Sequence, residues 1–224
     1  MTRTCIFSVL VFSLAAPSFT AERLPFDELS MIYETNTTDG DAEIVITVQG
    51  FEGLKSLQVR APSGRVIATA QSNDRIRRGK AIGLAEVIIE TGEPDIESVK
   101  AAYPEGTYQF FGRTVSGARL FGEAVLSHDV LPGPTFTPNE AEDLDPDAVV
   151  VQWVAIPGAA GYLVEIENDD LDFNITAKLP GTATSFAIPA GVLVPGTEYE
   201  VGVASITEDG NLAFAESSFT TAGP

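Results

Sequence analysis

Three short clusters of acidic and amide side chains have the composition of a metal site built from oxygen ligands. They lie at residues 36–41, 143–147 and 169–172. Calcium prefers several oxygen ligands on a flexible loop, so Asn36, Asp39 and Asp41 form a candidate calcium site. None of the clusters has the full EF-hand spacing, and aspartate and asparagine also favour tight turns without any metal. We therefore expect no cofactor and keep calcium as the alternative.

Side chains that carry out catalysis are scarce. His128 is the only histidine and Cys5 the only cysteine, and the chain has no Gly-x-Ser-x-Gly elbow and no phosphate-binding glycine loop. A histidine without a marked nucleophile is expected at the surface or between domains. A carboxylate pair for glycoside chemistry could be drawn from 32 acidic residues, which makes any choice arbitrary. The sequence predicts a protein that is not an enzyme, with a carboxylate-dependent enzyme as the least favoured alternative.

Two further groups of side chains are candidates for binding. Arg75, Arg77 and Arg78 share one loop, where they either bind an acidic partner or a carboxylate-rich glycan, or balance acidic neighbours. Balancing is the favoured interpretation. Phe111 alternates away from Phe110, so it could stack on a sugar ring or a partner if it were exposed. Packing of Phe111 in the core against a short helix is the favoured expectation.

The charge of the chain limits its partners. The 224 residues carry a formal net charge of -19. A surface this anionic repels phosphate backbones and anionic lipids. We therefore predict no nucleic-acid partner, and expect an unknown protein or a polysaccharide.

Residues 1–21 have the layout of a secretory signal peptide. Arg3 precedes an apolar run at 5–16, and small residues follow at 18–21. The apolar run is too short to span a bilayer, so no membrane span is expected. Cys5 lies inside this segment, which leaves the mature chain without a disulfide and favours a bacterial source. The predicted location is periplasmic or extracellular.

The strands of residues 22–131 are predicted from the alternation of apolar and polar residues. Strand-like segments lie at 29–33, 44–48, 54–60, 65–70, 83–91, 107–115 and 118–127. Turn-forming residues separate them. Residues 95–103 interrupt this pattern, because apolar side chains recur there at helical spacing behind a capping aspartate. About seven strands and one short helix predict an antiparallel, immunoglobulin-like β-sandwich.

Residues 132–224 contain the most specific pattern of the chain. Alternating apolar residues at 149–153 end on Trp153, and the alternation at 162–166 begins with Tyr162. A Pro-Gly-Thr-x-Tyr run then ends at Tyr199. In this order the residues resemble a fibronectin type III domain. The resemblance implies that Trp153, Tyr162 and Tyr199 lie in the core, and that the Tyr199 hydroxyl bonds to upstream backbone.

The whole chain also resembles a set of exported bacterial proteins that end in a fibronectin type III domain. The resemblance rests on Thr-Asp-Gly-Asp at 38–41, Tyr-Pro-Glu-Gly-Thr-Tyr at 103–108 and Leu-Phe-Gly-Glu-Ala at 120–124. It implies no activity. Two prolines at 132–134 predict a short, stiff link between the domains.

The predicted fold is all-β, with two antiparallel immunoglobulin-like β-sandwiches in tandem. The predicted divisions are a signal peptide (1–21), an immunoglobulin-like β-sandwich domain (22–131) and a fibronectin type III domain (132–224). Because such folds are scaffolds for many functions, the leading hypothesis is a non-enzymatic exported module that binds a protein or polysaccharide. The alternative is a calcium-stabilised structural or adhesion segment.

Overall fold

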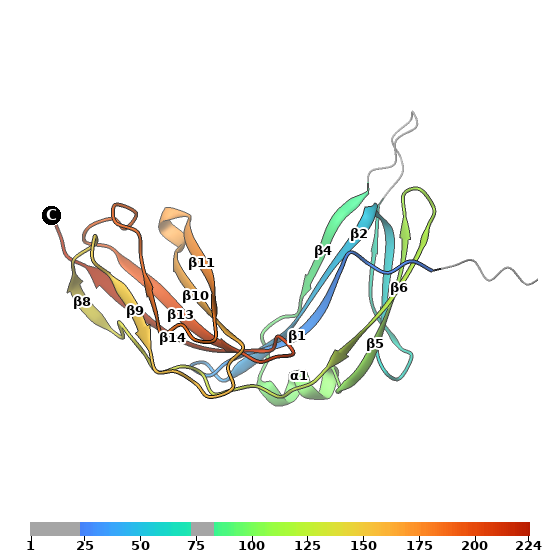
Figure 1. Ribbon diagram of the computed structural model, residues 1–224, viewed down its shortest axis with the longest axis horizontal. Helices are drawn as coiled ribbons and strands as arrows, with labels where there is room; N and C mark the ends of the chain where they lie inside the picture. The colour runs from blue at the N-terminus through green and yellow to red at the C-terminus, as the bar shows by residue number, and fades with distance from the viewer. Residues whose placement is uncertain (1–22, 73–82) are drawn as a thin grey trace, which may run out of the picture.

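The computed structural model describes residues 23–72 and 83–224, and most of its regular structure is β-strand. The strands form two antiparallel, immunoglobulin-like sandwiches in tandem, of which the first carries one short α-helix. The two sandwiches form the arms of an open V (Figure 1). The fold class predicted from the sequence is therefore confirmed.

The first sandwich contains six strands and one helix in the described residues. They are β1 (Glu28–Asn36), β2 (Asp41–Arg60), β3 (Val66–Gln71), β4 (Leu84–Glu90), α1 (Ile96–Ala102), β5 (Gly106–Thr114) and β6 (Arg119–Leu126). No helix in the described ranges is long and apolar enough to cross a membrane.

The second sandwich contains eight strands and a single 3-10 turn. They are β7 (Phe136–Thr137), β8 (Ala141–Leu144), β9 (Val150–Trp153), β10 (Gly161–Asn168), η1 (Asp169–Leu171), β11 (Phe173–Pro180), β12 (Ser185–Ala187), β13 (Glu198–Ile206) and β14 (Leu212–Thr221). A three-stranded sheet, in the order β12-β9-β7, forms one layer, and β11-β10-β13-β14 forms the other.

β2 is one strand of 20 residues that belongs to both layers of the first sandwich. Its first half pairs with β1 and β4, and most of its second half pairs with β3 and β5. The sequence predicts separate strands at 44–48 and 54–60, which is wrong, because the backbone bends between them without ending the strand. Glu52 and Gly53 supply the bend with positive φ angles.

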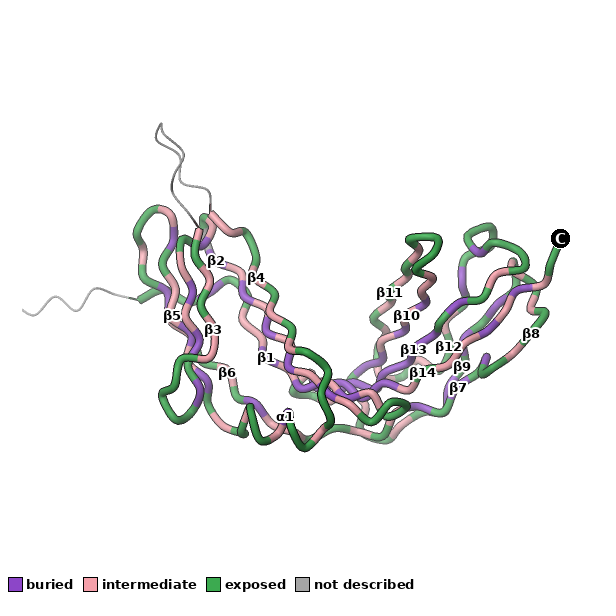
Figure 2. The backbone as a smooth tube through the Cα atoms, turned by 180° about the vertical axis from the view of Figure 1, so that it is seen from behind, coloured by how far each residue is buried: buried purple, intermediate pink, exposed green. Residues whose placement is uncertain are grey.

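Alternation along the strands builds the core of the first sandwich. Met31 and Tyr33 of β1 point inward, as do Tyr108 and Phe110 of β5. Buried positions, purple in Figure 2, lie along the strands of both arms and where the arms meet. The predicted helix is present, and Val99 is its buried residue.

The helix begins where the sequence predicts. The Asp95 side chain accepts a hydrogen bond from the Ser98 backbone N–H at 3.1 Å, which satisfies a donor that the first turn cannot pair internally. The hydrogen bonds from Ser98 hold the pKa of Asp95 below its ordinary value.

Three aromatic side chains form the centre of the second core. Trp153 is 5% exposed, Tyr162 is fully buried and Tyr199 is 1% exposed. The rings of Trp153 and Tyr162 lie 5.2 Å apart. The ring of Tyr199 stacks against that of Phe219 on the paired strand β14, with the ring centroids 5.6 Å apart.

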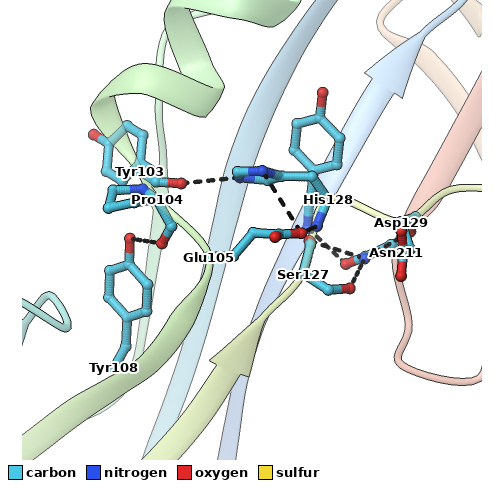
Figure 3. Close-up of polar contacts among 9 residues, drawn as sticks. Tyr103, Pro104, Glu105, Tyr108, Ser127, His128, Asp129 and Asn211 are labelled. Carbon is cyan, nitrogen blue, oxygen red and sulfur yellow. Dashed lines mark hydrogen bonds and ion pairs between the residues drawn. The ribbon is translucent and has the colours of Figure 1, made fainter.

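Each sandwich ties a tyrosine hydroxyl to nearby backbone. In the second sandwich the Val194 N–H donates to the Tyr199 hydroxyl at 2.8 Å. In the first sandwich the Tyr108 hydroxyl donates to the Pro104 carbonyl at 2.9 Å (Figure 3). Both contacts fix the chain where it enters a strand, so the two sandwiches use the same local device.

A parallel strand pair joins the two sandwiches into one sheet. Residues 34–36 of β1 pair with residues 212–214 of β14. Because β14 also pairs with β13, and β1 with β2, an 11-stranded sheet runs through both arms. One face of this sheet lines the inside of the V, where β4 and β1 of one arm face β10 and β11 of the other (Figure 1).

Candidate functional site

Asn211 is the polar centre of the junction between the arms. Its side chain is buried, and its Oδ1 accepts a hydrogen bond from the Tyr33 backbone N–H at 2.9 Å. Its Nδ2 donates to the carbonyls of Ser127 and Asp129 at 3.1 and 2.9 Å, and to the Ser127 hydroxyl at 3.0 Å (Figure 3). One side chain therefore binds the first sandwich, the linker and the second sandwich together.

Apolar packing and further backbone bonds complete the junction. Ala204, Ile206, Leu212 and Phe214 form a buried cluster, against which Ile32 of β1 packs. The Ser205 hydroxyl donates to the carbonyl of Pro132 in the linker at 2.9 Å. The Thr37 N–H and hydroxyl both donate to the Phe214 carbonyl, at 2.8 and 2.6 Å. These contacts fix the angle between the arms.

An acidic groove of about 1030 Å³ lies over β10, β13 and β14, on the face inside the V. Among the described residues that line it, nine are carboxylates and none is lysine or arginine. Those on the strands are Glu165 and Glu167 of β10, Glu198 and Glu200 of β13, and Glu216 of β14. The other four, at 39, 140, 169 and 170, flank the strands.

Strand register explains the shape of the groove. Glu165 lies opposite Gly202, which lies opposite Glu216, so these three residues form one row across the sheet. Glu167 and Glu200 share the next row. Gly202 has no side chain, and the Phe214 ring lies 3.3 Å from where its Cβ would be, so a shallow trough that this ring partly fills separates the carboxylates on either side. Successive rows of glutamates on one sheet face therefore point into the same space.

The carboxylates at the base of the V hold their protons more tightly than usual. Burial, and then the charges of Glu43 and Glu165, raise the pKa of Glu34 to about 8. Burial and neighbouring carboxylates raise the pKa of Glu43 to about 7. The pKa values of Glu165 and Glu216 are raised mainly by burial as well. Partly buried carboxyl groups that repel one another when ionised are thus concentrated where the two arms meet.

These pKa values predict a fall in stability with rising pH. Glu34 has its ordinary pKa of 4.5 when the chain is unfolded and about 8 when it is folded. Below the lower value both states are protonated and full stability is present. It is lost as the pH rises through about 8, because the folded state must then carry a buried charge. A melting-temperature series across this window measures the effect.

The matched test replaces Glu34 with glutamine, which removes the charge and keeps the shape. The variant is expected to be stabilised at pH 8 by on the order of 1 kcal/mol, or about 2–4 °C in melting temperature. Its dependence on pH should be flatter than that of the native chain. Glu142→Gln, at an exposed position, is the control. Equal pH slopes for the native chain and the Glu34 variant would contradict the assignment.

The candidate calcium ligands lie in the β1–β2 hairpin at one end of the groove. Asn36 Oδ1 accepts hydrogen bonds from the N–H groups of Thr38 and Asp39, at 2.9 and 3.3 Å, so it closes the turn. Asn36 Nδ2 donates to Glu216 at 2.7 Å. Asp41 begins β2. Over residues 23–72 and 83–224 no three histidine, cysteine or acidic side chains are grouped so as to hold a metal ion.

The binding candidates have different outcomes. Arg75, Arg77 and Arg78 lie outside the described residues. Phe111 is half-buried on the outer face of β5, where its ring packs 5.3 Å from that of Phe121. The expected packing of Phe111 in the core against the helix is therefore wrong. The reason is alternation, because Tyr108 and Phe110 take the inward positions of the strand.

His128 lies at the junction between the arms. The sequence predicts it either at the surface or between domains, and the second of these is its position. Its Nε2 is 2.9 Å from the Tyr103 carbonyl, and its ring meets that of Tyr33 edge-on at 4.9 Å. The side chain is 12% exposed. Its neighbours Ser127 and Asp129 are those that bind Asn211 (Figure 3). The histidine therefore helps to pack the base of the first arm.

The sequence gives no sign of the role of Asn211. An asparagine after Asp-Gly is an ordinary turn residue, and its hydrogen-bond partners lie far away along the chain. The groove cannot be predicted from the sequence either. Its carboxylates come from separate strands, and only the register between these strands brings them together.

Comparisons with known proteins concern the fold. No family model matches the chain. The chain is similar to FN3tt, at 20% identity over 41% of this chain and 96% of that one, with a TM-score of 0.30. It is also similar to the FN1–FN3 domains of chicken CNTN1, at 11% identity over 89% of this chain and 65% of that one, with a TM-score of 0.33.

A two-domain fibronectin type III segment of chicken tenascin is a further neighbour. The identity is 13% over 87% of this chain and 98% of that one, with a TM-score of 0.34. Three features of the second sandwich agree with this fold: the buried Trp153, the hydrogen bond between the Val194 N–H and the Tyr199 hydroxyl, and the two layers of strands. The second sandwich is fibronectin type III-like.

Proposed function

We propose that this chain is a non-enzymatic, exported binding module whose acidic groove takes a positively charged segment of a protein partner. The observation that carries the proposal is the groove itself, whose lining in the described part of the chain contains nine carboxylates and no basic residue. Charge complementarity of this kind steers encounter and gives specificity. Export, and the domain limits 22–131 and 132–224, belong to the proposal and rest on the sequence pattern.

The trough at Gly202 favours lysine or arginine side chains as the bound groups. A cation above Gly202 would have Glu165 on one side and Glu216 on the other. Burial is the main reason that the pKa values of these carboxylates are raised, and neighbouring carboxylates add to it; a bound cation would offset that added repulsion. Because the junction already fixes the arms, little conformational entropy would be lost on binding.

The test measures binding of a fluorescent oligolysine peptide to the full chain by anisotropy. Removal of three groove charges, in the variant Glu165→Gln, Glu200→Gln, Glu216→Gln, is expected to weaken binding about tenfold or more, or at least about 1.4 kcal/mol. The matched control removes three exposed charges from the first sandwich, at Glu28, Glu93 and Glu97. It should bind like the native chain.

Equal losses in the two triple variants would overturn the proposal, because binding would then follow net charge alone. Affinity should also fall as salt is added, since the contact is electrostatic. The same measurement repeated with calcium addresses the alternative of a calcium-stabilised segment. Competition between calcium and the peptide, together with a calcium-dependent melting temperature, would favour that alternative.

A further inference from the structure

The outer face of the first sandwich carries a second group of side chains, away from the acidic groove. Strand register places Gln71, Ser56, Arg113 and Arg119 in one row across β3, β2, β5 and β6. The adjacent row contains Thr69, Gln58, Phe111 and Phe121. These rows lie on the opposite side of the sheet from the buried Leu57 and Leu120.

Two more arginines frame the phenylalanine pair. The Arg23 guanidinium lies 5.5 Å from the Phe111 ring centroid and 5.4 Å from that of Phe121. The Arg60 guanidinium lies 5.2 Å from the Phe111 centroid, and its Nε donates to Gln58 at 2.8 Å. Arg23 is held there because Leu24 exchanges backbone hydrogen bonds with the β6 segment.

Between these rows lies a pocket of about 300 Å³. Its lining includes Arg23, Arg113, Arg119, Phe111, Ser56 and Gln58, and no carboxylate of residues 23–72 and 83–224 lines it. None of Arg23, Arg60, Arg113 and Arg119 forms an ion pair within the described residues. The next row along this face contains Arg60, Gln109 and Glu123, so a carboxylate lies near Arg60. The three arginines that line the pocket, Arg23, Arg113 and Arg119, have positive charge available for a ligand.

We propose that this pocket binds an acidic saccharide, through the carboxylate of a uronic acid residue. Arginine guanidinium groups match a carboxylate with two parallel hydrogen bonds. Phe111 contributes the part of its ring that lines the pocket, and the Arg23 and Arg60 guanidiniums stacked over the Phe111 and Phe121 rings hold the two arginines at the pocket edge, where the face of a sugar ring can pack beside them. Serine, threonine and glutamine side chains of the two rows supply donors and acceptors for sugar hydroxyls. The volume is at the lower end of the range of small-molecule sites, which suits a short stretch of sugar.

An acidic peptide fits the same face less well. Its carboxylates would use the arginines but would leave Gln58, Ser56 and Thr69 without matching hydroxyls. The pocket lies over β2, β3, β5 and β6, whereas the acidic groove lies over β10, β13 and β14, and the two share no lining residue, so the proposal does not depend on the acidic groove.

The experiment titrates the full chain with trigalacturonate in a calorimeter. Maltotriose, which has similar rings without carboxylates, and triglutamate, which has carboxylates without sugar rings, are the comparison ligands. We expect trigalacturonate to bind at least tenfold more tightly than either. The double variant Arg113→Gln, Arg119→Gln should lose at least tenfold in affinity while its melting temperature stays that of the native chain.

A matched control removes two exposed positive charges elsewhere, in Arg65→Gln, Lys178→Gln, and should keep the native affinity. A third variant, Phe111→Leu, should weaken binding severalfold because it removes an aromatic face and keeps an apolar side chain. Absence of trigalacturonate binding, equal binding of triglutamate, or an unchanged affinity in the Arg113, Arg119 variant would each overturn the proposal. The groove variants with Glu165, Glu200 and Glu216 replaced should bind the saccharide at least as well as the native chain.

Discussion

Replacing Asn211 with alanine is expected to lower the free energy of unfolding by about 3–5 kcal/mol. The side chain is 2% exposed and makes four hydrogen bonds across the junction. Its loss leaves the Tyr33 N–H and the carbonyls of Ser127 and Asp129 without this partner in a region that water reaches poorly. Each such group costs about 1–3 kcal/mol when left unsatisfied.

Equilibrium denaturation measures this cost, and small-angle X-ray scattering measures the angle between the arms. The variant is expected to show a broader distribution of particle dimensions, since the arms lose their shared polar contact. Asn139→Ala is the control, because Asn139 is exposed and only accepts a hydrogen bond from Ser217. If Asn211→Ala unfolds like the native chain and scatters like it, the junction does not depend on this residue.

Replacing Trp153 with alanine is expected to cost about 3–5 kcal/mol, the range for truncation of a large aromatic residue in a core. Its indole is 5% exposed and packs against the Tyr162 ring. The substitution would leave a cavity between the two layers of the second sandwich. The layers could fill it only by moving β9 together with its paired strands β7 and β12.

Two further variants make the Trp153 result specific. Val154→Ala, at the adjacent position with 69% exposure, should be nearly silent. Trp153→Phe should cost less than the alanine variant, because Trp153 Nε1 has no hydrogen-bond partner among the described residues and loses nothing on removal. Denaturation with guanidinium chloride ranks the three. A silent Trp153→Ala would contradict the central place of this residue in the core.

Local pattern was enough to predict most of the fold. Alternation at 29–33 and 107–115 correctly separates inward from outward residues, and capping chemistry places the helix start at Asp95. The same rule misjudged β2, since the backbone bends at Glu52 and Gly53 within one strand and does not end there. Glycines permit both outcomes, and only the pairing partners decide between them.

The candidate sites were harder to predict because they depend on register between distant strands. Alternation sets Phe111 on the other face of its strand from Phe110, yet the favoured expectation that it packs in the core is wrong, and its contact with Phe121 and Arg23 follows from pairing that no single segment reveals. Likewise, Glu165 and Glu216 are ordinary surface glutamates in the sequence. They become a groove only because Gly202 lies between them on neighbouring strands.

The pairing of β1 with β14 has a consequence for how the molecule is made. The Tyr33–Asn211 hydrogen bond connects residues 178 positions apart. During synthesis the first sandwich can form through contacts between residues that are close in sequence. Its β1 edge stays unpaired at that stage, because the ribosome has not yet produced β14. Contacts of such high sequence separation form slowly and late. The acidic groove, whose lining includes Asp39 of the hairpin and Glu216 of β14, therefore cannot be complete before β14 has been synthesised.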